Sequence, residues 1–254
     1  MASRFETGHF INLSNFGTLL TYLATQPAYL PDAAELKPAA LEQYRQEVQA
    51  ATNTLITEAA ALQQAVNNRQ QLFEQMRKLA RRLMRYLEAN STDHEAIKDI
   101  ATHYRMLSAR PVSRRIVVQE DGTVSEKAYS GSRLSFHSMA ENFQKMVERI
   151  ATMTHYAPTD IRISLPALQA RYEELHTTNS EVNTQYQVVH NARYDRDLLM
   201  YKKDTGLVDL VRRVKKYLQY KYGPASDQYH YANSLRFTRK QLRTGELIAD
   251  EPEP

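Results

Sequence analysis

The sequence contains no cysteine and no tryptophan, and its 254 residues include only seven glycines. Without cysteine there is no disulfide, no thiolate nucleophile and no thiolate metal ligand, which excludes a disulfide-stabilised scaffold and a cysteine-based enzyme. The chain also has no phosphate-binding glycine loop and no Gly-x-Ser-x-Gly nucleophile elbow. We therefore expect stability to come from packing alone, and we expect no enzymatic activity and no cofactor.

Long apolar runs are absent as well. No window approaches the roughly eighteen uninterrupted apolar residues of a membrane-spanning helix, and residues 1–8 lack the basic and apolar regions of a cleavable signal. This predicts no membrane insertion and a cytoplasmic location, although export that needs no cleaved signal stays open. The net charge of +4 is too small for this length to indicate nucleic-acid binding by itself.

The sequence indicates an internal duplication. A shift of 127 residues aligns Asn15-Phe16 with Asn142-Phe143, Tyr29 and Pro31 with Tyr156 and Pro158, and Arg69 with Arg196. Beyond Arg69 the offset becomes 135, which implies an insertion of eight residues near 201–206. Because apolar positions also match, the two copies share a buried pattern as well as scattered identities.

Each copy has the pattern of a short helix, a Tyr-x-Pro turn, a long helical region and a short terminal helix. The expected boundaries are 1–110 for the first helical repeat, 111–136 for a linker, 137–240 for the second repeat and 241–254 for a disordered acidic tail. Within the linker, two β-prone stretches flank Glu120-Asp121-Gly122. They favour a small hairpin and a flexible linker about equally.

The long helical regions carry a heptad pattern. Between Pro38 and Glu88 there is no glycine and no internal proline, and one apolar frame runs through Leu41, Val48, Leu55, Leu62, Met76 and Leu83. Either a single helix or a hairpin turning at Asn67-Asn68 fits this pattern. In the second copy we expect breaks near 201–206 and at Gly223-Pro224. The prediction is an all-α fold of two tandem, diverged copies with long coiled-coil-like helices.

The stretch Thr205–Leu210 (TGLVDL) is followed by Val214-Lys215, Tyr217, Tyr222-Gly223, Ser226, Gln228-Tyr229 and Leu235–Phe237. Together with Ser135-Phe136, Asn142-Phe143 and Tyr156-x-Pro158, it resembles a family of bacterial hypothetical proteins. Tyr222-Gly223 stands where that family has Phe-Gly. The resemblance implies a duplicated helical fold, and it implies no catalytic residues.

Two aligned stretches are rich in basic residues. The candidate basic faces are Arg77, Arg81, Arg82 and Arg85 in the first copy, and Arg212, Arg213, Lys215 and Lys216 in the second. Such faces neutralise spaced phosphates, and nearby tyrosines offer stacking surfaces for bases. The alternative, a solvated helix face paired with acidic neighbours, is favoured by the low net charge.

The C-terminal part is rich in tyrosine, with Tyr217, Tyr220, Tyr229 and Tyr231 as candidate interface residues. Metal-like spacings occur at Glu173 and His176 and at Glu95, Asp99 and His103, but they are more typical of surface charge ladders, and we expect no metal site. The leading hypothesis is a non-enzymatic structural protein that self-assembles as a homo-oligomer. Nucleic-acid binding through the paired basic helices is the alternative.

Overall fold

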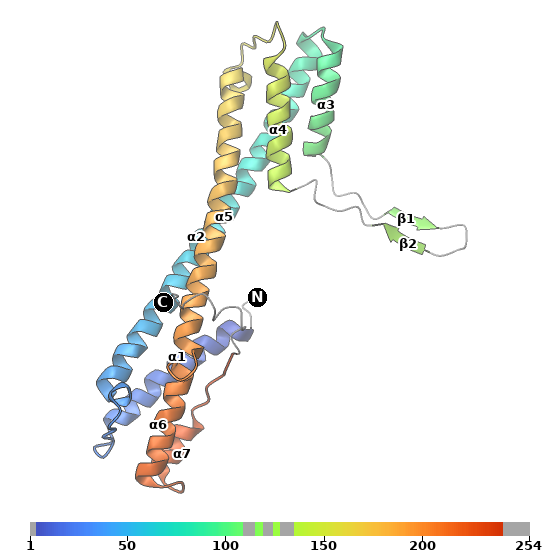
Figure 1. Cartoon of the computed structure of the whole chain (residues 1–254). Coiled ribbons are helices and arrows are strands. Elements are labelled where there is room, and N and C mark those ends of the chain that lie inside the picture. Colours follow the sequence, from blue (N-terminus) through green and yellow to red (C-terminus); the bar gives the residue numbers. More distant parts are fainter. Residues whose placement is uncertain (1–3, 109–114, 119–123, 128–134, 241–254) are drawn as a thin grey trace, which may run out of the picture. The chain divides into compact units, whose positions relative to one another are not determined.

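The structure, a computed structural model, describes residues 4–108, 115–118, 124–127 and 135–240 (Figure 1). The elements in these ranges are α1 (Arg4–Ala24), η1 (Ala34–Leu36), α2 (Pro38–Asn90), α3 (His94–Ser108), β1 (Arg115–Val118), β2 (Val124–Lys127), α4 (Phe136–Ala151), η3 (Ile161–Ile163), α5 (Leu165–Tyr201), α6 (Leu207–Tyr222) and α7 (Asp227–Ser234). The prediction of an all-α fold is confirmed. None of the helices in these ranges has the length and apolar character needed to cross a membrane.

The two strands lie within the segment 111–136, which the sequence predicts as a linker. β1 and β2 pair antiparallel, with Arg115 opposite Lys127 and Val118 opposite Val124. This pairing is the small-hairpin alternative for the linker. The expected turn at 120–122 and the expected acidic tail at 241–254 lie outside the described residues.

α2 is one uninterrupted helix of 53 residues, so the single-helix alternative is correct for this segment. Asn67 and Asn68 lie within it. Asparagine in a helix interior costs less than about 1 kcal/mol per residue relative to alanine, too little to force a turn without glycine or proline. After α2, the Asp93 carboxylate accepts the Ala96 N–H at 2.9 Å and so caps the start of α3.

Both breaks expected in the second copy are confirmed. The first is the turn between α5 and α6, where Asp204 has a φ of +66° and its N–H donates to the Asp209 carboxylate at 2.9 Å. A Cβ on Gly206 would lie 2.7 Å from both the backbone N and O of Lys202, so only glycine fits there. The second break follows α6, where Gly223 has a φ of +92°.

The chain forms two compact units that combine halves of both predicted repeats. Unit 1 consists of Met1–Ala60 and Gln187–Pro254, and unit 2 consists of Ala61–Tyr186. Unit 1 therefore contains the first elements of the first repeat and the last elements of the second, while unit 2 contains the reverse. The boundaries 1–110 and 137–240 describe the sequence, and they do not coincide with these compact units.

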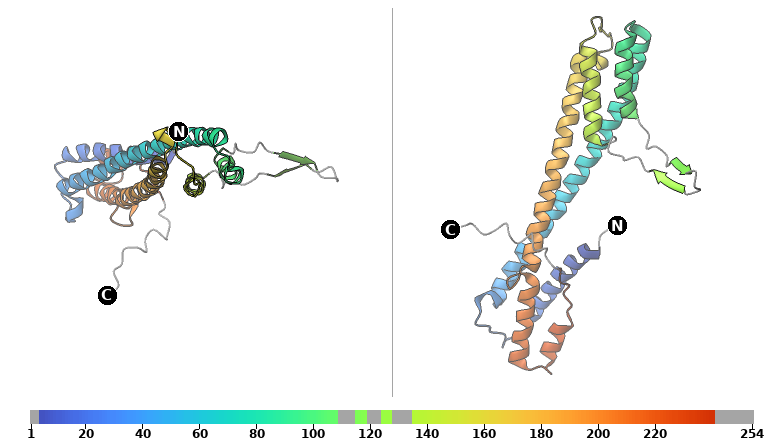
Figure 2. Two further views of the ribbon diagram at one scale, coloured as in Figure 1. Left: turned by 90° about the horizontal axis from the view of Figure 1, so that it is seen from above. Right: turned by 45° about the vertical axis from the view of Figure 1, so that its right-hand side comes forward.

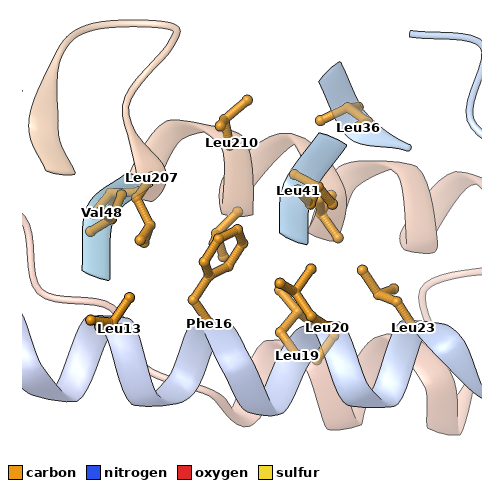
Figure 3. Close-up of a cluster of buried hydrophobic side chains, with 14 of the residues drawn as sticks. Leu13, Phe16, Leu19, Leu20, Leu23, Leu36, Leu41, Val48, Leu207 and Leu210 are labelled. Atoms are coloured by element: carbon orange, nitrogen blue, oxygen red, sulfur yellow. The ribbon is translucent and has the colours of Figure 1, made fainter. Parts of the chain in front are cut away.

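The core of unit 1 is built on α1. Figure 3 shows Phe16, Leu19 and Leu23 pointing from α1 toward α2 and α6. The buried cluster includes Leu41 and Val48 of α2, Met200 of α5, and Leu207, Leu210 and Val214 of α6. Since α1 places apolar residues at helical spacing, the face that carries Leu13, Phe16 and Leu20 is covered.

The core of unit 2 is built in the same way on α4. Phe143, Met146 and Ile150 are fully buried among Met76, Leu83 and Leu87 of α2, and Ile100 of α3 joins them. α3 and α4 pack against each other, as the views in Figures 1 and 2 agree. Phe143 corresponds to Phe16 at the offset of 127, and both have no exposed surface.

A tyrosine hydrogen bond recurs in both units. The Tyr29 hydroxyl donates to the Leu36 carbonyl at 2.8 Å in unit 1, and the Tyr156 hydroxyl donates to the Ile163 carbonyl in unit 2. Both residues of each pair are related by the offset of 127. Burial raises the pKa of Tyr29 and of Tyr156 well above the usual value, so both stay protonated donors. The Tyr-x-Pro turns thus anchor η1 and η3 in the same manner.

Candidate interaction surfaces

Most of the predicted basic face of α6 is engaged inside unit 1. Arg212 pairs with Asp209 at 3.2 Å, and Arg213 pairs with Glu35 at 2.6 Å. The Lys215 ammonium donates to the Leu235 carbonyl at 2.7 Å and lies 5.3 Å from the centre of the Phe237 ring. Burial lowers the pKa of Lys215. Only Lys216 of the four predicted residues is exposed and makes no ion pair with a described residue.

The basic face of α2 is more open. Arg77, Lys78, Arg81, Arg82 and Arg85 are all exposed. Arg82 pairs with Asp160 at 3.0 Å, and an Arg77 guanidinium nitrogen lies 3.2 Å from the Met139 sulfur. Lys78, Arg81 and Arg85 make no ion pair with any residue that the structure describes. The two faces align in the sequence, but they are not equivalent in their free charge.

A groove runs along the basic face within unit 2, with an open volume of about 560 Å³. We call it the basic groove, and its lining residues are Gln75, Lys78, Leu79, Arg82, Ile161, Arg162, Ala167 and Arg171. Four of these are cations and none is acidic. Asp160 pairs with Arg82 and Arg162, and Glu174 pairs with Arg171, so the charge is partly compensated from outside the lining. Ile161 is 79% exposed.

Unit 1 has a groove at the corresponding position, with an open volume of about 450 Å³. We call it the acidic groove, and its lining residues are Glu35, Ala40, Gln43, Tyr44, Glu47, Asp204, Thr205, Leu210 and Arg213. Ala40 and Tyr44 align with Ala167 and Arg171 at the offset of 127, and Arg213 aligns with Lys78 at 135. The two grooves therefore occupy related positions but carry opposite charge.

The predicted interface tyrosines fall into two groups. Tyr220 is 82% exposed, and its ring lies 6.2 Å from that of Tyr217. The Tyr217 hydroxyl donates to the carbonyl of Leu30, which is itself 74% exposed. We call Leu30, Tyr217 and Tyr220 the tyrosine patch. It lies in unit 1, and Tyr217 follows Arg213 of the acidic groove by one helical turn.

Tyr229 and Tyr231 form the second group, on α7. The Tyr231 ring is partly exposed and lies 4.3 Å from that of Tyr22 on α1. Tyr229 is half-buried, and its backbone N–H donates to the Ser226 hydroxyl that caps α7. Among the described residues no ring contact joins this group to Tyr217 and Tyr220, so the four tyrosines do not form one continuous aromatic surface.

A buried polar cluster in unit 1 is not signalled by the sequence. Asp197 accepts from Arg196 at 2.8 Å and from Lys240 at 2.5 Å, while His9 lies 3.0 Å from Arg196 through Nε2 and 2.8 Å from the Tyr201 hydroxyl through Nδ1. Burial, reinforced by the charge of Arg196, lowers the pKa of His9 to about 4. His9 is therefore neutral at pH 7, and its Nε2 accepts from the guanidinium while Nδ1–H faces the Tyr201 oxygen.

This cluster holds the extended segment 235–240 against α1. Asn12 donates through Nδ2 to the Thr238 carbonyl and accepts the Thr238 N–H, both at 2.8 Å. Asn15 donates to the Arg236 carbonyl at 2.7 Å. Because the buried groups are paired with each other and with this segment, the cluster stabilises the fold rather than presenting reactive groups to a groove.

Unit 2 has an apolar counterpart of the cluster. Arg69, which aligns with Arg196, lies 4.2 Å over the ring of Phe136, which aligns with His9. The shared arginine was the only sequence signal available. His9 lies 187 residues from Arg196 and Lys240 lies 43 residues from Asp197, so no local spacing could reveal the cluster.

The residues with metal-like spacing lie apart or have other partners. Glu173 and His176 are both exposed. Asp99 pairs with Arg149 at 3.1 Å, and His103 contacts the Asn142 side chain at 3.2 Å. In the ranges that the structure describes, no three His, Asp or Glu side chains gather as a metal-binding group.

No family model, curated protein or solved structure matches this chain. The resemblance of the Thr205–Leu210 region to bacterial hypothetical proteins therefore stays an expectation.

Proposed function

We propose that this protein is a non-enzymatic structural protein whose copies associate through surfaces of their helical units. The observation that carries this proposal is the tyrosine patch. Leu30 and Tyr220 are large side chains left largely in water next to the half-buried Tyr217. Tyrosine in such a position supplies a large, stiff contact with a polar tip, which is why it is enriched in protein interfaces.

The repeated architecture supports association between like chains. We infer that the chain arose by duplication, because the Tyr29 and Tyr156 hydrogen bonds and the buried Phe16 and Phe143 recur at one offset. A duplicated chain carries two related but diverged surfaces. Such surfaces allow one type of contact to recur from copy to copy.

The experiment is light scattering across a concentration series. The mass of the wild-type protein should rise above that of one chain as concentration increases, and Leu30→Ser combined with Tyr220→Ser should shift the rise to at least about tenfold higher concentration. Ile56→Ser is the matched control, since Ile56 is another exposed apolar residue of unit 1 outside the patch. A wild-type protein with the mass of one chain at every concentration would refute the proposal.

Nucleic-acid binding is the second candidate, and one observation favours it. Lys78, Arg81 and Arg85 are exposed on α2 without ion-pair partners among the described residues, which leaves their charge free to neutralise phosphates. A gel shift with single-stranded RNA at low salt should then weaken steeply as salt is raised, and Arg81→Glu with Arg85→Glu should abolish it. Lys203→Glu with Lys221→Glu, at two exposed positions of unit 1, is the control for the same change in net charge. No shift of RNA at low salt removes this candidate.

A further inference from the structure

We propose that the contact between copies joins unlike surfaces: the basic groove of one copy receives the acidic groove and the tyrosine patch of the next. This inference rests on the self-association proposed above and adds its geometry. The occupant of each groove is thus a second copy of this chain. The proposal follows from the opposite character of two surfaces that correspond in the fold.

The charges of the two linings favour unlike pairing. The basic groove is lined by Lys78, Arg82, Arg162 and Arg171 without an acidic residue. The acidic groove is lined by Glu35, Glu47 and Asp204, with Arg213 as its only cation. A two-fold contact of the basic groove with itself would place four cations against four cations. Contact between unlike grooves places opposite charges together, which favours both encounter and register.

The helix faces beside the grooves differ in a matching way. At the offset of 135, Arg213, Tyr217 and Tyr220 of α6 align with Lys78, Arg82 and Arg85 of α2. Both sets follow the spacing of one helical face. Where one face presents exposed tyrosine, the other presents exposed guanidinium groups. An arginine over a tyrosine ring is a favourable cation–π pair, and Arg85 has no ion-pair partner among the described residues to compete for it.

Apolar side chains complete the contact on both sides. Ile161 of η3 lines the basic groove, and the carbonyl of Leu30, which precedes η1, accepts from Tyr217, one helical turn after Arg213 of the acidic groove. Both are more than two-thirds exposed. Burying them together would remove apolar surface from water at the centre of a charged rim, which is the usual arrangement of a specific interface. Because every chain carries both surfaces, the contact can repeat along a series of copies.

The absence of cysteine allows a direct test by cross-linking. Glu47→Cys and Lys78→Cys each place one thiol at the rim of one groove. Both positions are exposed, and neither native residue makes an ion pair within the described part of the chain. A short bis-maleimide should link a mixture of the two variants into covalent dimers. It should link neither variant alone. Lys98→Cys on α3, mixed with Glu47→Cys, is the control for random collision.

Each outcome of the cross-linking decides between defined arrangements. Dimers in the mixture alone support the unlike pairing. Dimers of Lys78→Cys with itself, at the yield of the mixture, would overturn it in favour of a two-fold contact. If light scattering shows the wild-type protein to be oligomeric but the mixture of cysteine variants gives no groove-specific dimers, the unlike pairing is overturned while the proposed function stays intact. A monomeric wild type would refute the proposed function itself.

Charge reversal provides a second, independent measurement. Glu47→Lys and Lys78→Glu should each weaken association by about tenfold or more, since each places like charges across the contact. The chain carrying both changes should recover most of the wild-type affinity, because each junction then again joins opposite charges. A double variant that associates no better than either single variant would overturn the pairing of these two residues.

Discussion

Acidification should destabilise unit 1 through His9. The side chain is buried between Arg196 and the Tyr201 hydroxyl, with Asp197 and Lys240 also within the cluster. Its pKa is lowered from 6.5 to about 4. Between these two pH values the unfolded chain binds a proton at His9, whereas the folded unit does not. The stabilising contribution is therefore complete above pH 6.5 and is lost as the pH falls toward 4.

The size of the effect follows from the shift in pKa. A lowering of the pKa from 6.5 to about 4 corresponds to a total of about 3 kcal/mol, which is reached only below about pH 4, where both the folded and the unfolded chain bind the proton. Between pH 7.5 and pH 5, the linkage relation gives a loss of about 2 kcal/mol. The pKa of Asp197 is raised by burial, but hydrogen bonds from Lys240 and Arg196 outweigh burial and the net shift is downward. Its contribution is lost only below about pH 4, outside this window.

The comparison is between the native residue and His9→Gln. Glutamine can accept from Arg196 and donate to Tyr201, but it does not titrate. Phe10→Trp in both backgrounds supplies a fluorescence reporter in α1, because the chain has no other tryptophan. Urea unfolding at pH 7.5 and pH 5 then gives the free energy of unfolding of unit 1. The difference between the two pH values should be about 2 kcal/mol smaller in the glutamine variant. Equal pH dependence in both backgrounds would show that His9 is not held neutral by the cluster.

Three further outcomes are expected from single substitutions. Leu55→Asp and Val182→Asp each bury an unpaired charge, so each should destabilise the fold by more than about 3 kcal/mol in thermal melts followed by circular dichroism. Ile56→Asp, at an exposed neighbour, should change little. Unchanged melting of both buried variants would contradict the heptad assignment. Gly206→Ala forces a Cβ against the Lys202 backbone and should cost about 2 kcal/mol by the same assay, while a neutral effect would mean that the turn can widen. Asn12→Ala removes both hydrogen bonds to Thr238, so it should lower the free energy of unfolding by about 1–3 kcal/mol and speed hydrogen exchange of the Thr238 amide. Asn15→Ala is the milder comparison. Unchanged exchange would show that segment 235–240 is held by other contacts.

The local features of the chain were predictable from the sequence. The absence of glycine and proline from 39–88 allows α2 to continue, and the heptad positions Leu41, Val48 and Leu55 are buried as the pattern predicts. Leu62 in the same frame is only half-buried. The breaks at 202–206 and at Gly223 were also predictable. Each of these features depends on residues within a few positions of one another, and their spacing is visible in the sequence.

Which surface charges are engaged and which stay free was decided only by the tertiary structure. Nothing in the spacing of the two basic stretches distinguishes them, yet Lys215 is held by Leu235 and Phe237 while Arg85 is left free of ion pairs among the described residues. Likewise the pKa of His9 is lowered because folding buries the side chain and brings it to Arg196, 187 residues away. Charge and burial at a position depend on which distant residues pack there. The sequence by itself therefore determined the helices, their ends and their apolar faces, whereas packing between distant segments determined which charges stay free and which sign each groove carries.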